Sequence, residues 1–226
     1  MDRFLATLHL DIRLQLRNGI YAAVIFVALL TAFAVGVLPG DNRHWLLPPL
    51  VLNNLLLTSF YVAAALWLLE SDEGALMARA ATPLRSGEYL AARGLSLSAL
   101  ALAQSITSVG ALTSGAFDLL PLISGSLAAA LILSWAGAAA VTRFTAINSF
   151  LLPSIPLAAA LLLPVIGYIF AWPLWALAWH PLQGPLVLLR AVTAPTDGAL
   201  LLFAIVASAL WCGLSFWIAL RCYRRQ

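Results

Sequence analysis

Long apolar runs separated by short polar segments dominate this sequence, and each run has about the length that crosses a bilayer. A helix needs about 20 apolar residues to span a hydrocarbon core of about 30 Å. Composition agrees, because only 9% of residues are charged, whereas an ordinary globular domain carries about 25%. We therefore predict an all-α integral membrane protein with one transmembrane domain, residues 1–226, whose six spans lie at about 20–39, 46–69, 94–114, 119–141, 149–171 and 199–220.

A charged leader, residues 2–18, precedes the first apolar run. On a helical wheel, His9, Arg13 and Arg17 lie away from an apolar face made by Phe4, Leu5, Leu8, Ile12 and Leu16. Residues 8–17 also alternate as a strand would, but a lone strand at a membrane surface would leave its backbone unpaired. We predict an interfacial helix over residues 1–18; a merely basic leader is the alternative.

Polar residues interrupt the second and third spans. Asn54, Thr58 and Tyr61 share one face of the second span at helical spacing. The third span carries Gln104 and Ser108, four residues apart. Such groups either line a transport path or hydrogen-bond between helices, which is common within membranes. We keep both interpretations, with these five residues as tentative path residues.

Prolines mark the second and fifth spans. Pro48-Pro49 predicts the start of the second span, because proline is tolerated at a helix start. The fifth span contains three interior prolines, and an interior proline removes a backbone donor and kinks a helix. We therefore predict a bent or mobile fifth span, with Pro153, Pro156 and Pro164 as the prolines responsible.

The segment between the fifth and last spans, residues 172–198, is too apolar for a free loop. Proline and glycine also break it too often for a full span. We predict a re-entrant or interfacial hairpin whose turn lies at residues 181–184. The alternative is an aromatic belt at the end of the fifth span, since tryptophan favours the membrane interface and Trp172, Trp175 and Trp179 recur near the helical period.

Basic residues lie almost entirely on one side of the predicted spans. All twelve are arginines, and with the N-terminus inside, only Arg43 and Arg190 fall on the outer side. This positive-inside asymmetry predicts that both termini and residues 70–93 are cytoplasmic. Because the sequence contains no lysine, it cannot supply the lysine of a P-loop. If ATP drives this protein, another polypeptide binds the nucleotide.

The sequence shows no catalytic or metal-binding constellation. Cys212 and Cys222 are ten residues apart, a helical rise of about 15 Å, and no metal-ligand spacing surrounds them. The predicted spans also lack central ionisable residues, which proton-coupled carriers place there. We predict no catalytic residue, no metal and no cofactor bound by this chain, and we rank a membrane enzyme third among the possible classes.

The cytoplasmic connection at residues 70–93 is the most polar part of the chain, with seven of its 21 charged residues. Residues 75–81 are strong helix formers that end before Thr82-Pro83, because the residue before proline avoids helix. Ser86 is a predicted N-cap, with Glu88 in the first turn of the following helix. The sequence predicts a short helix across the membrane plane; a helical hairpin lying on the membrane surface is the alternative.

This connection resembles the loop between spans two and three of type-2 ATP-binding-cassette permeases. The resemblance lies in Glu70 through Leu76, Thr82-Pro83-Leu84 and Glu88-Tyr89-Leu90, with Ala75 where threonine is usual and Arg93 where lysine is frequent. The leader at residues 11–19 is similar to that of small fluoroquinolone-type export permeases, and so are His180-Pro181, Gly184 and Leu188 to Arg190.

The resemblance implies an N-terminal elbow helix, six spans, a coupling helix at about residues 73–84 and re-entrant helices before the last span. It also implies two membrane subunits, as a homodimer or with a second permease, and two separate ATPase subunits that bind ATP and Mg²⁺. The residues implied in ATPase coupling are Glu70, Glu73, Gly74, Leu76, Arg79, Thr82, Pro83, Arg85 and Glu88.

We therefore expect the membrane subunit of an ATP-driven exporter in a bacterial cytoplasmic membrane. Its apolar spans favour a lipophilic or amphipathic substrate such as a drug, a lipid or a peptide. Nucleic acid is not needed to explain the net charge of +3, because lipid headgroups satisfy it. The alternative is a membrane scaffold or assembly factor that transports nothing; it predicts that no ATPase accompanies the chain.

Overall fold

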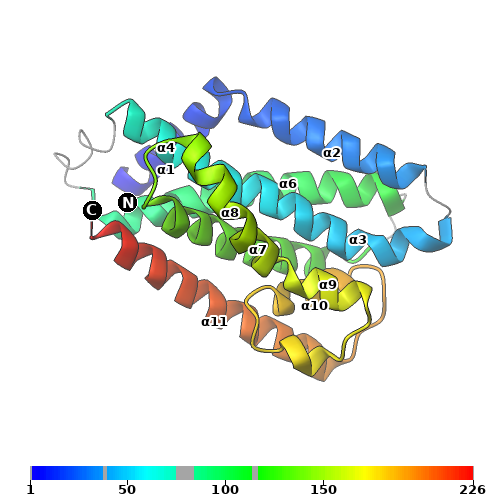
Figure 1. Ribbon diagram of the computed structural model, residues 1–226. Helices are drawn as coiled ribbons and strands as arrows, with labels where there is room; N and C mark the ends of the chain where they lie inside the picture. Colours follow the sequence, from blue (N-terminus) through cyan, green and yellow to red (C-terminus); the bar gives the residue numbers. More distant parts are fainter. Residues whose placement is uncertain (1, 38–39, 75–83, 114–116, 226) are drawn as a thin grey trace.

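The computed structural model describes residues 2–37, 40–74, 84–113 and 117–225; of residues 2, 3 and 40–44 it describes the backbone alone. This part of the chain is all-helical, and its long helices run side by side as a bundle (Figure 1). Both chain ends lie beside the end of α4 (Val62–Asp72) and the start of α6 (Ser86–Thr113). We call this the terminal end of the bundle, and the other the opposite end.

Four helical stretches are long and apolar enough to cross a membrane: Trp45–Asp72, α6, α7 (Leu119–Val141) and α11 (Gly198–Tyr223). Two bent pairs pass the same test together. Helix α1 (Asp2–Arg17) meets α2 (Ile20–Gly36) at 66°, and α8 (Ile147–Leu161) meets α9 (Leu163–Ile169) at 47°. The described residues thus provide four to six candidate spans, depending on whether each bent pair counts as one.

The helix of the second apolar run begins earlier than the prolines predict. Helix α3 spans Gly40–Leu55, with Pro48 and Pro49 inside it. A proline removes the bond from its own nitrogen to the carbonyl four residues earlier. Only the carbonyls of residues 44 and 45 lose that bond, and both lie near the start of the helix. The predicted start at Pro48-Pro49 is therefore wrong.

The same run continues through a segment whose conformation the sequence does not predict. Residues Leu56–Tyr61 form a π-helix, η1, between α3 and α4. A π-helical turn widens a helix locally and is often found at functional positions. It includes Thr58 and Tyr61, two of the tentative path residues.

Helix α7 lies at the centre of the bundle and packs against α4, α6, α10, α11 and η1. Its buried positions are rich in small residues, which let helix backbones approach closely in membranes. Gly137 is the closest case, because a β-carbon built there would lie 2.3 Å from the carbonyl oxygen of Phe60 in η1. The glycine therefore seats the central helix directly on the π-helical segment.

The leader is a helix, so the strand pattern at residues 8–17 is overridden. Helix α1 packs against α6, but not through the leucines that the helical wheel emphasises. Among the described side chains of α1, Asp11 and Gln15 are buried, whereas Leu5 and Leu16 are more than half exposed. The face toward α6 is polar, which leaves the apolar side chains free to contact lipid.

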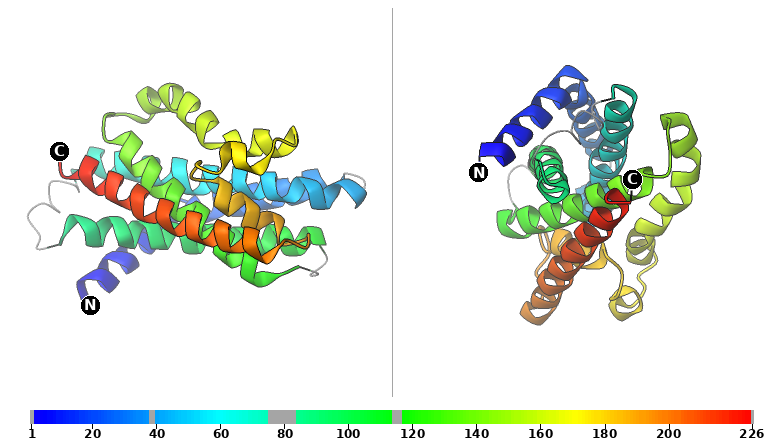
Figure 2. Two further views of the ribbon diagram at one scale, coloured as in Figure 1. Left: turned by 90° about the horizontal axis from the view of Figure 1, so that it is seen from below. Right: turned by 90° about the vertical axis from the view of Figure 1, so that its left-hand side faces the viewer.

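The chain between α9 and α11 folds as short helical turns. A 3₁₀ helix, η2 (Leu174–Leu177), is followed by α10 (Gln183–Arg190), which packs against α7 and α11. All residues of α10 except Arg190 are buried. Two views place this region at the opposite end, with α8 set apart from the central helices (Figure 2). The turn predicted at residues 181–184 is thus partly helix, because α10 begins at Gln183.

Candidate functional site

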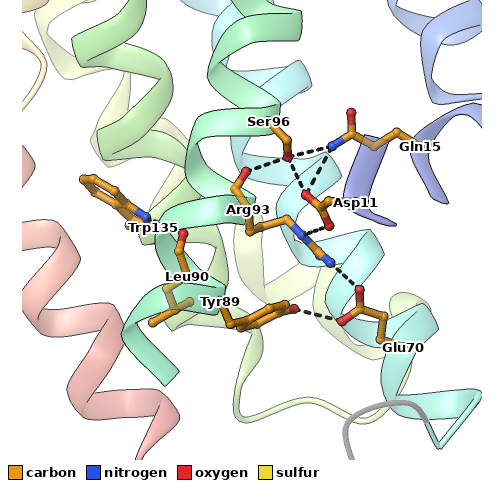
Figure 3. A network of polar contacts seen from close by, with 8 residues as sticks. All are labelled: Asp11, Gln15, Glu70, Tyr89, Leu90, Arg93, Ser96 and Trp135. Carbon is orange, nitrogen blue, oxygen red and sulfur yellow. Dashed lines mark hydrogen bonds and ion pairs between the residues drawn. The ribbon is translucent and has the colours of Figure 1, made fainter. Parts of the chain in front are cut away.

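A buried cluster of charged and polar side chains joins three helices near the terminal end. Asp11 comes from α1, Glu70 from the last turns of α4 and Arg93 from α6, and none is more than 4% exposed. Figure 3 shows the Arg93 guanidinium between the two carboxylates. We call Asp11, Glu70 and Arg93 the charge triad.

Each bond of the triad uses a different part of the guanidinium. The Nε of Arg93 donates to Oδ1 of Asp11 at 2.6 Å, and Nη2 donates to Oε1 of Glu70. Charge-assisted hydrogen bonds of this kind are among the strongest in proteins. The remaining nitrogen, Nη1, is buried with no hydrogen-bond partner among the described residues.

Neutral side chains complete the cluster. Tyr89, one turn before Arg93, donates its hydroxyl to Glu70 Oε2 at 2.8 Å, and Ser96 donates to Asp11 Oδ2. Gln15 donates to the Ser96 hydroxyl at 2.9 Å (Figure 3). Both carboxylates thus accept from more than one donor. Isolated buried charges are costly, and paired, hydrogen-bonded charges offset that cost.

The triad lies near the two helix ends that flank the 75–83 segment, the end of α4 and the start of α6. We call these two helix ends the roots of the segment. Helix α4 ends at Asp72, where Gly74 adopts a left-handed conformation with φ of 69°, a common end signal for helices. Helix α6 begins at Ser86, with the Glu88 carboxylate accepting from the backbone N–H of Arg85 at 3.1 Å. Arg85 therefore holds the cap position predicted for Ser86, which is an error of one residue.

The residues predicted for ATPase coupling divide into three groups. Glu70 is buried in the triad, and Glu73 forms an exposed ion pair with Arg17 of α1 at 3.2 Å. Gly74, Arg85 and Glu88 form the roots described above. The predicted short helix and the rest of the set lie outside the described residues: Leu76, Arg79, Thr82 and Pro83.

Sequence reasoning found Glu70 but missed its partners. Arg93 was assigned to the connection before the third span, and Asp11 only to the leader. The usable signal is the N-cap predicted at Ser86, because a helix that begins there places Arg93 two turns inside it, as α6 does. A buried arginine there requires a carboxylate, and Asp11 is the acidic residue on the buried face of α1.

Four of the five tentative path residues make polar contacts between helices, whereas the Ser108 hydroxyl is buried with no hydrogen-bond partner among the described residues. Thr58 donates to Gln104 at 2.5 Å, and Asn54 donates to Thr31 of α2 at 3.0 Å. Tyr61 lies 3.5 Å from the hydroxyl of Ser154 in α8. These contacts are what the packing interpretation predicts; whether Asn54, Thr58, Tyr61, Gln104 and Ser108 also line a path stays a prediction.

An apolar groove of about 490 Å³ lies between α7, α8 and α11. Its walls include Trp135, Phe150, Leu157 and Trp211, and Arg143 lies on its lining toward the terminal end. Ligand sites are typically mostly apolar, with a few polar groups that fix orientation. None of the five tentative path residues lines this groove, although Tyr61 borders it through its ring contact with Phe150.

His180 closes the bend between α8 and α9. The bend lies just before Pro164, whose missing N–H leaves the Ala160 carbonyl without its usual partner within the helix. The Nε2 of His180 lies 3.0 Å from that carbonyl oxygen, and the backbone N–H of Leu182 donates to Nδ1 at 3.2 Å. These bonds require a neutral ring protonated on Nε2. The side chain thus supplies the donor that proline lacks.

Burial lowers the pKa of His180, an effect partly opposed by its bond to Ala160. The folded state therefore favours the neutral ring, so stability should be complete above pH 6.5, the ordinary histidine pKa, and decline as pH falls below it. We expect thermal unfolding in detergent to show this decline between pH 7 and pH 5. His180→Gln, whose amide can donate to the Ala160 carbonyl without titrating, should flatten it; an unchanged pH dependence would contradict this role.

Taken together, the helices and the buried polar contacts define a multi-span α-helical membrane protein. A family model for the fluoroquinolones export permease protein family matches residues 2–226. Two proteins of Mycobacterium tuberculosis, from strains H37Rv and CDC 1551, are both described as fluoroquinolones export permease proteins. Each is 30% identical to this chain over 192 residues, which cover 84% of this chain and 81% of the relative. The chain belongs to the fluoroquinolones export permease family, and it is a membrane component of a transporter.

Proposed function

We propose that this chain is a type-2 ATP-binding-cassette permease, the membrane subunit of an ATP-driven exporter. Two copies, or one copy and a second permease, work with separate ATPase subunits that hold ATP and Mg²⁺. Membership of an export permease family supports a transport role, and the lack of lysine requires the P-loop to reside in another polypeptide. In this arrangement the chain itself catalyses no reaction.

The observation that carries the proposal is the position of the charge triad. A connection that transmits force needs rigid roots, and the triad fixes the roots of the 75–83 segment to each other and to α1. The Arg17–Glu73 pair adds a second link between α1 and the first root. We propose that residues 73–84 act as a coupling helix on the ATPase and that α1 acts as an interfacial elbow helix. Movement of this segment then tilts α1, α4 and α6 together.

The distribution of arginine supports a cytoplasmic terminal end. Of the arginines whose side chains the structure describes, Arg190 lies at the opposite end and eight lie at the terminal end: Arg13, Arg17, Arg85, Arg93, Arg143, Arg221, Arg224 and Arg225. Positive-inside topology then places both termini and the 75–83 segment on the cytoplasmic side of a bacterial inner membrane. The turns around η2 and α10 are re-entrant at the outer face in this topology.

We further propose that the substrate is lipophilic or amphipathic and passes along the groove between α7, α8 and α11. The groove is lined mainly by aromatic and aliphatic side chains, which suits such a molecule and disfavours a highly charged solute. Fluoroquinolones, which the names of the relatives specify, fit this class because they are aromatic and amphipathic. Helix α8, which forms one wall of the groove, is set apart from the central helices (Figure 2).

Charge reversal in the connection tests the coupling role. We expect Glu73→Arg with Arg79→Glu and Arg85→Glu, introduced into the native host, to reduce energy-dependent fluoroquinolone efflux to the level of a deletion strain. The matched control reverses Arg224 and Arg225 in the C-terminal tail and should retain efflux. Both proteins should be extracted in equal amounts with the same size-exclusion profile. Full efflux by the triple variant would exclude residues 73–85 as the coupling segment.

A further inference from the structure

A second cavity lies at the opposite end of the bundle, away from the charge triad and the apolar groove. It has a volume of about 300 Å³ and is bounded by α9, η2, α10 and Trp45 of α3. Trp45 and Tyr168 stack with ring centroids 5.8 Å apart, and Trp172 forms another wall. The polar residues of its lining include Gln183 and Arg190, from the two ends of α10.

Each of these two polar side chains has a group that an occupant of the cavity could bind. Arg190 is exposed and forms no ion pair with any described carboxylate. Gln183 is 4% exposed, and its Oε1 has no hydrogen-bond partner among the described residues. A buried polar atom without a partner is costly. An occupant that brought an anion and a hydrogen-bond donor would satisfy both residues.

The spacing of the two residues sets the length of that occupant. Gln183 and Arg190 are seven residues apart, so they share one face of α10 with a rise of about 10 Å between their backbones. Both side chains are long and extend from the same face. The occupant therefore carries its anionic group and its hydrogen-bond donor only several covalent bonds apart. An apolar portion next to them contacts the aromatic walls.

Exposed tryptophans indicate the depth at which this cavity lies. Trp175 and Trp179 are 78% and 66% exposed on the turns beside it, and Trp45 and Trp172 are both about half exposed. Tryptophan concentrates at the level of the lipid headgroups. An occupant at this depth meets headgroups first, and arginine pairs strongly with phosphate.

We propose that this cavity binds the headgroup of an anionic glycerophospholipid that carries a free hydroxyl, as phosphatidylglycerol does. The phosphate pairs with Arg190, and a headgroup hydroxyl donates to Oε1 of Gln183. The adjoining glycerol backbone packs against Trp45, Tyr168 and Trp172. The bound lipid fixes α10 and η2 to the bent α9. This inference depends on the membrane location of the chain and is independent of the proposed coupling to an ATPase.

Competition between defined lipids tests the site. The full-length chain in nanodiscs is compared in phosphatidylglycerol, phosphatidylmethanol (the same charge without the hydroxyl) and phosphatidylcholine, with retained lipid counted by native mass spectrometry. We expect the retained lipids to rank in that order. Arg190→Gln should weaken retention of both anionic lipids by about tenfold, the effect of losing one charge-assisted bond. Gln183→Leu should abolish only the preference for phosphatidylglycerol over phosphatidylmethanol.

Arg224→Gln is the matched control, because it removes an exposed arginine from the terminal end, and it should retain the wild-type ranking. If Arg190→Gln fails to fold, Arg190→Lys replaces it and should keep the anion preference at reduced strength. Equal retention of all three lipids by the wild-type chain would overturn the proposal. Protection from thermal unfolding by soluble glycerol phosphate, equal to that given by the lipid, would overturn the lipid assignment in favour of a free phosphate ester.

Discussion

Replacing Arg93 with methionine should be the most damaging single change in the charge triad. It leaves the carboxylates of Asp11 and Glu70 buried without a cation, although each keeps a neutral donor. Breaking a buried ion pair by removing one partner typically costs about 3–5 kcal/mol, which is a large fraction of the stability of a typical domain. We expect a large fall in the yield of folded protein and in the unfolding temperature measured in detergent.

An ion pair at the surface of the same region supplies the control for Arg93→Met. Arg17 and Glu73 also link α1 to the end of α4, but their side chains are 60% and 46% exposed, and exposed pairs contribute about 0–1 kcal/mol. Arg17→Met should therefore have little effect on unfolding. Glu70→Gln should lower the unfolding temperature by an intermediate amount, because Arg93 keeps its ion pair with Asp11. If Arg93→Met unfolded at the wild-type temperature, the triad would not fix the roots of the connection.

Gly137→Ala should have the second largest effect, although it adds a single methyl group. The new β-carbon would lie 2.3 Å from the carbonyl oxygen of Phe60 and 3.1 Å from its Cα. These are backbone atoms, so neither helix can relieve the overlap by rotating a side chain. Overpacking of this kind costs about 1–3 kcal/mol and occasionally more. We expect a lower unfolding temperature because α7 is displaced from the π-helical segment.

Gly213→Ala supplies the matched comparison. It lies inside α11, where an added β-carbon would meet nothing within 4 Å, and alanine is favoured over glycine in a helix by about 1 kcal/mol. The two substitutions should therefore change stability in opposite directions. A neutral Gly137→Ala would mean that α7 and η1 are not in direct backbone contact.

The long helices could be predicted from the sequence because burial in lipid and burial in protein both demand apolar side chains. The fourth span was predicted at 119–141, where α7 lies. Hydropathy alone begins the third span near residue 94, inside α6, but the predicted N-cap at Ser86 located the start of that helix to within one residue. The bent fifth span was predicted from its prolines, but the part of His180 in closing the bend depends on contacts twenty residues away.

The candidate site was only partly visible for a related reason. Glu70 stood out as an acidic residue at the end of a span, whereas Asp11 and Arg93 acquire meaning only when α1 folds against α6. Sequence patterns describe one helix at a time, and the triad takes one residue from each of three helices. The π-helix at Leu56–Tyr61 was missed as well, since hydropathy does not distinguish a π-helical turn from an α-helical one.

Affinity purification tests the central proposal, an exporter subunit driven through its connection by a separate ATPase. The tagged chain is isolated from its native host in mild detergent, beside the triple charge-reversal variant, and the accompanying proteins are identified by mass spectrometry. We predict a Walker-A ATPase in near-equal amount with the wild-type chain and its loss from the variant. A second six-span permease in the sample would indicate a heterodimer. Recovery of the folded wild-type chain with no ATPase would contradict the account and favour a membrane scaffold.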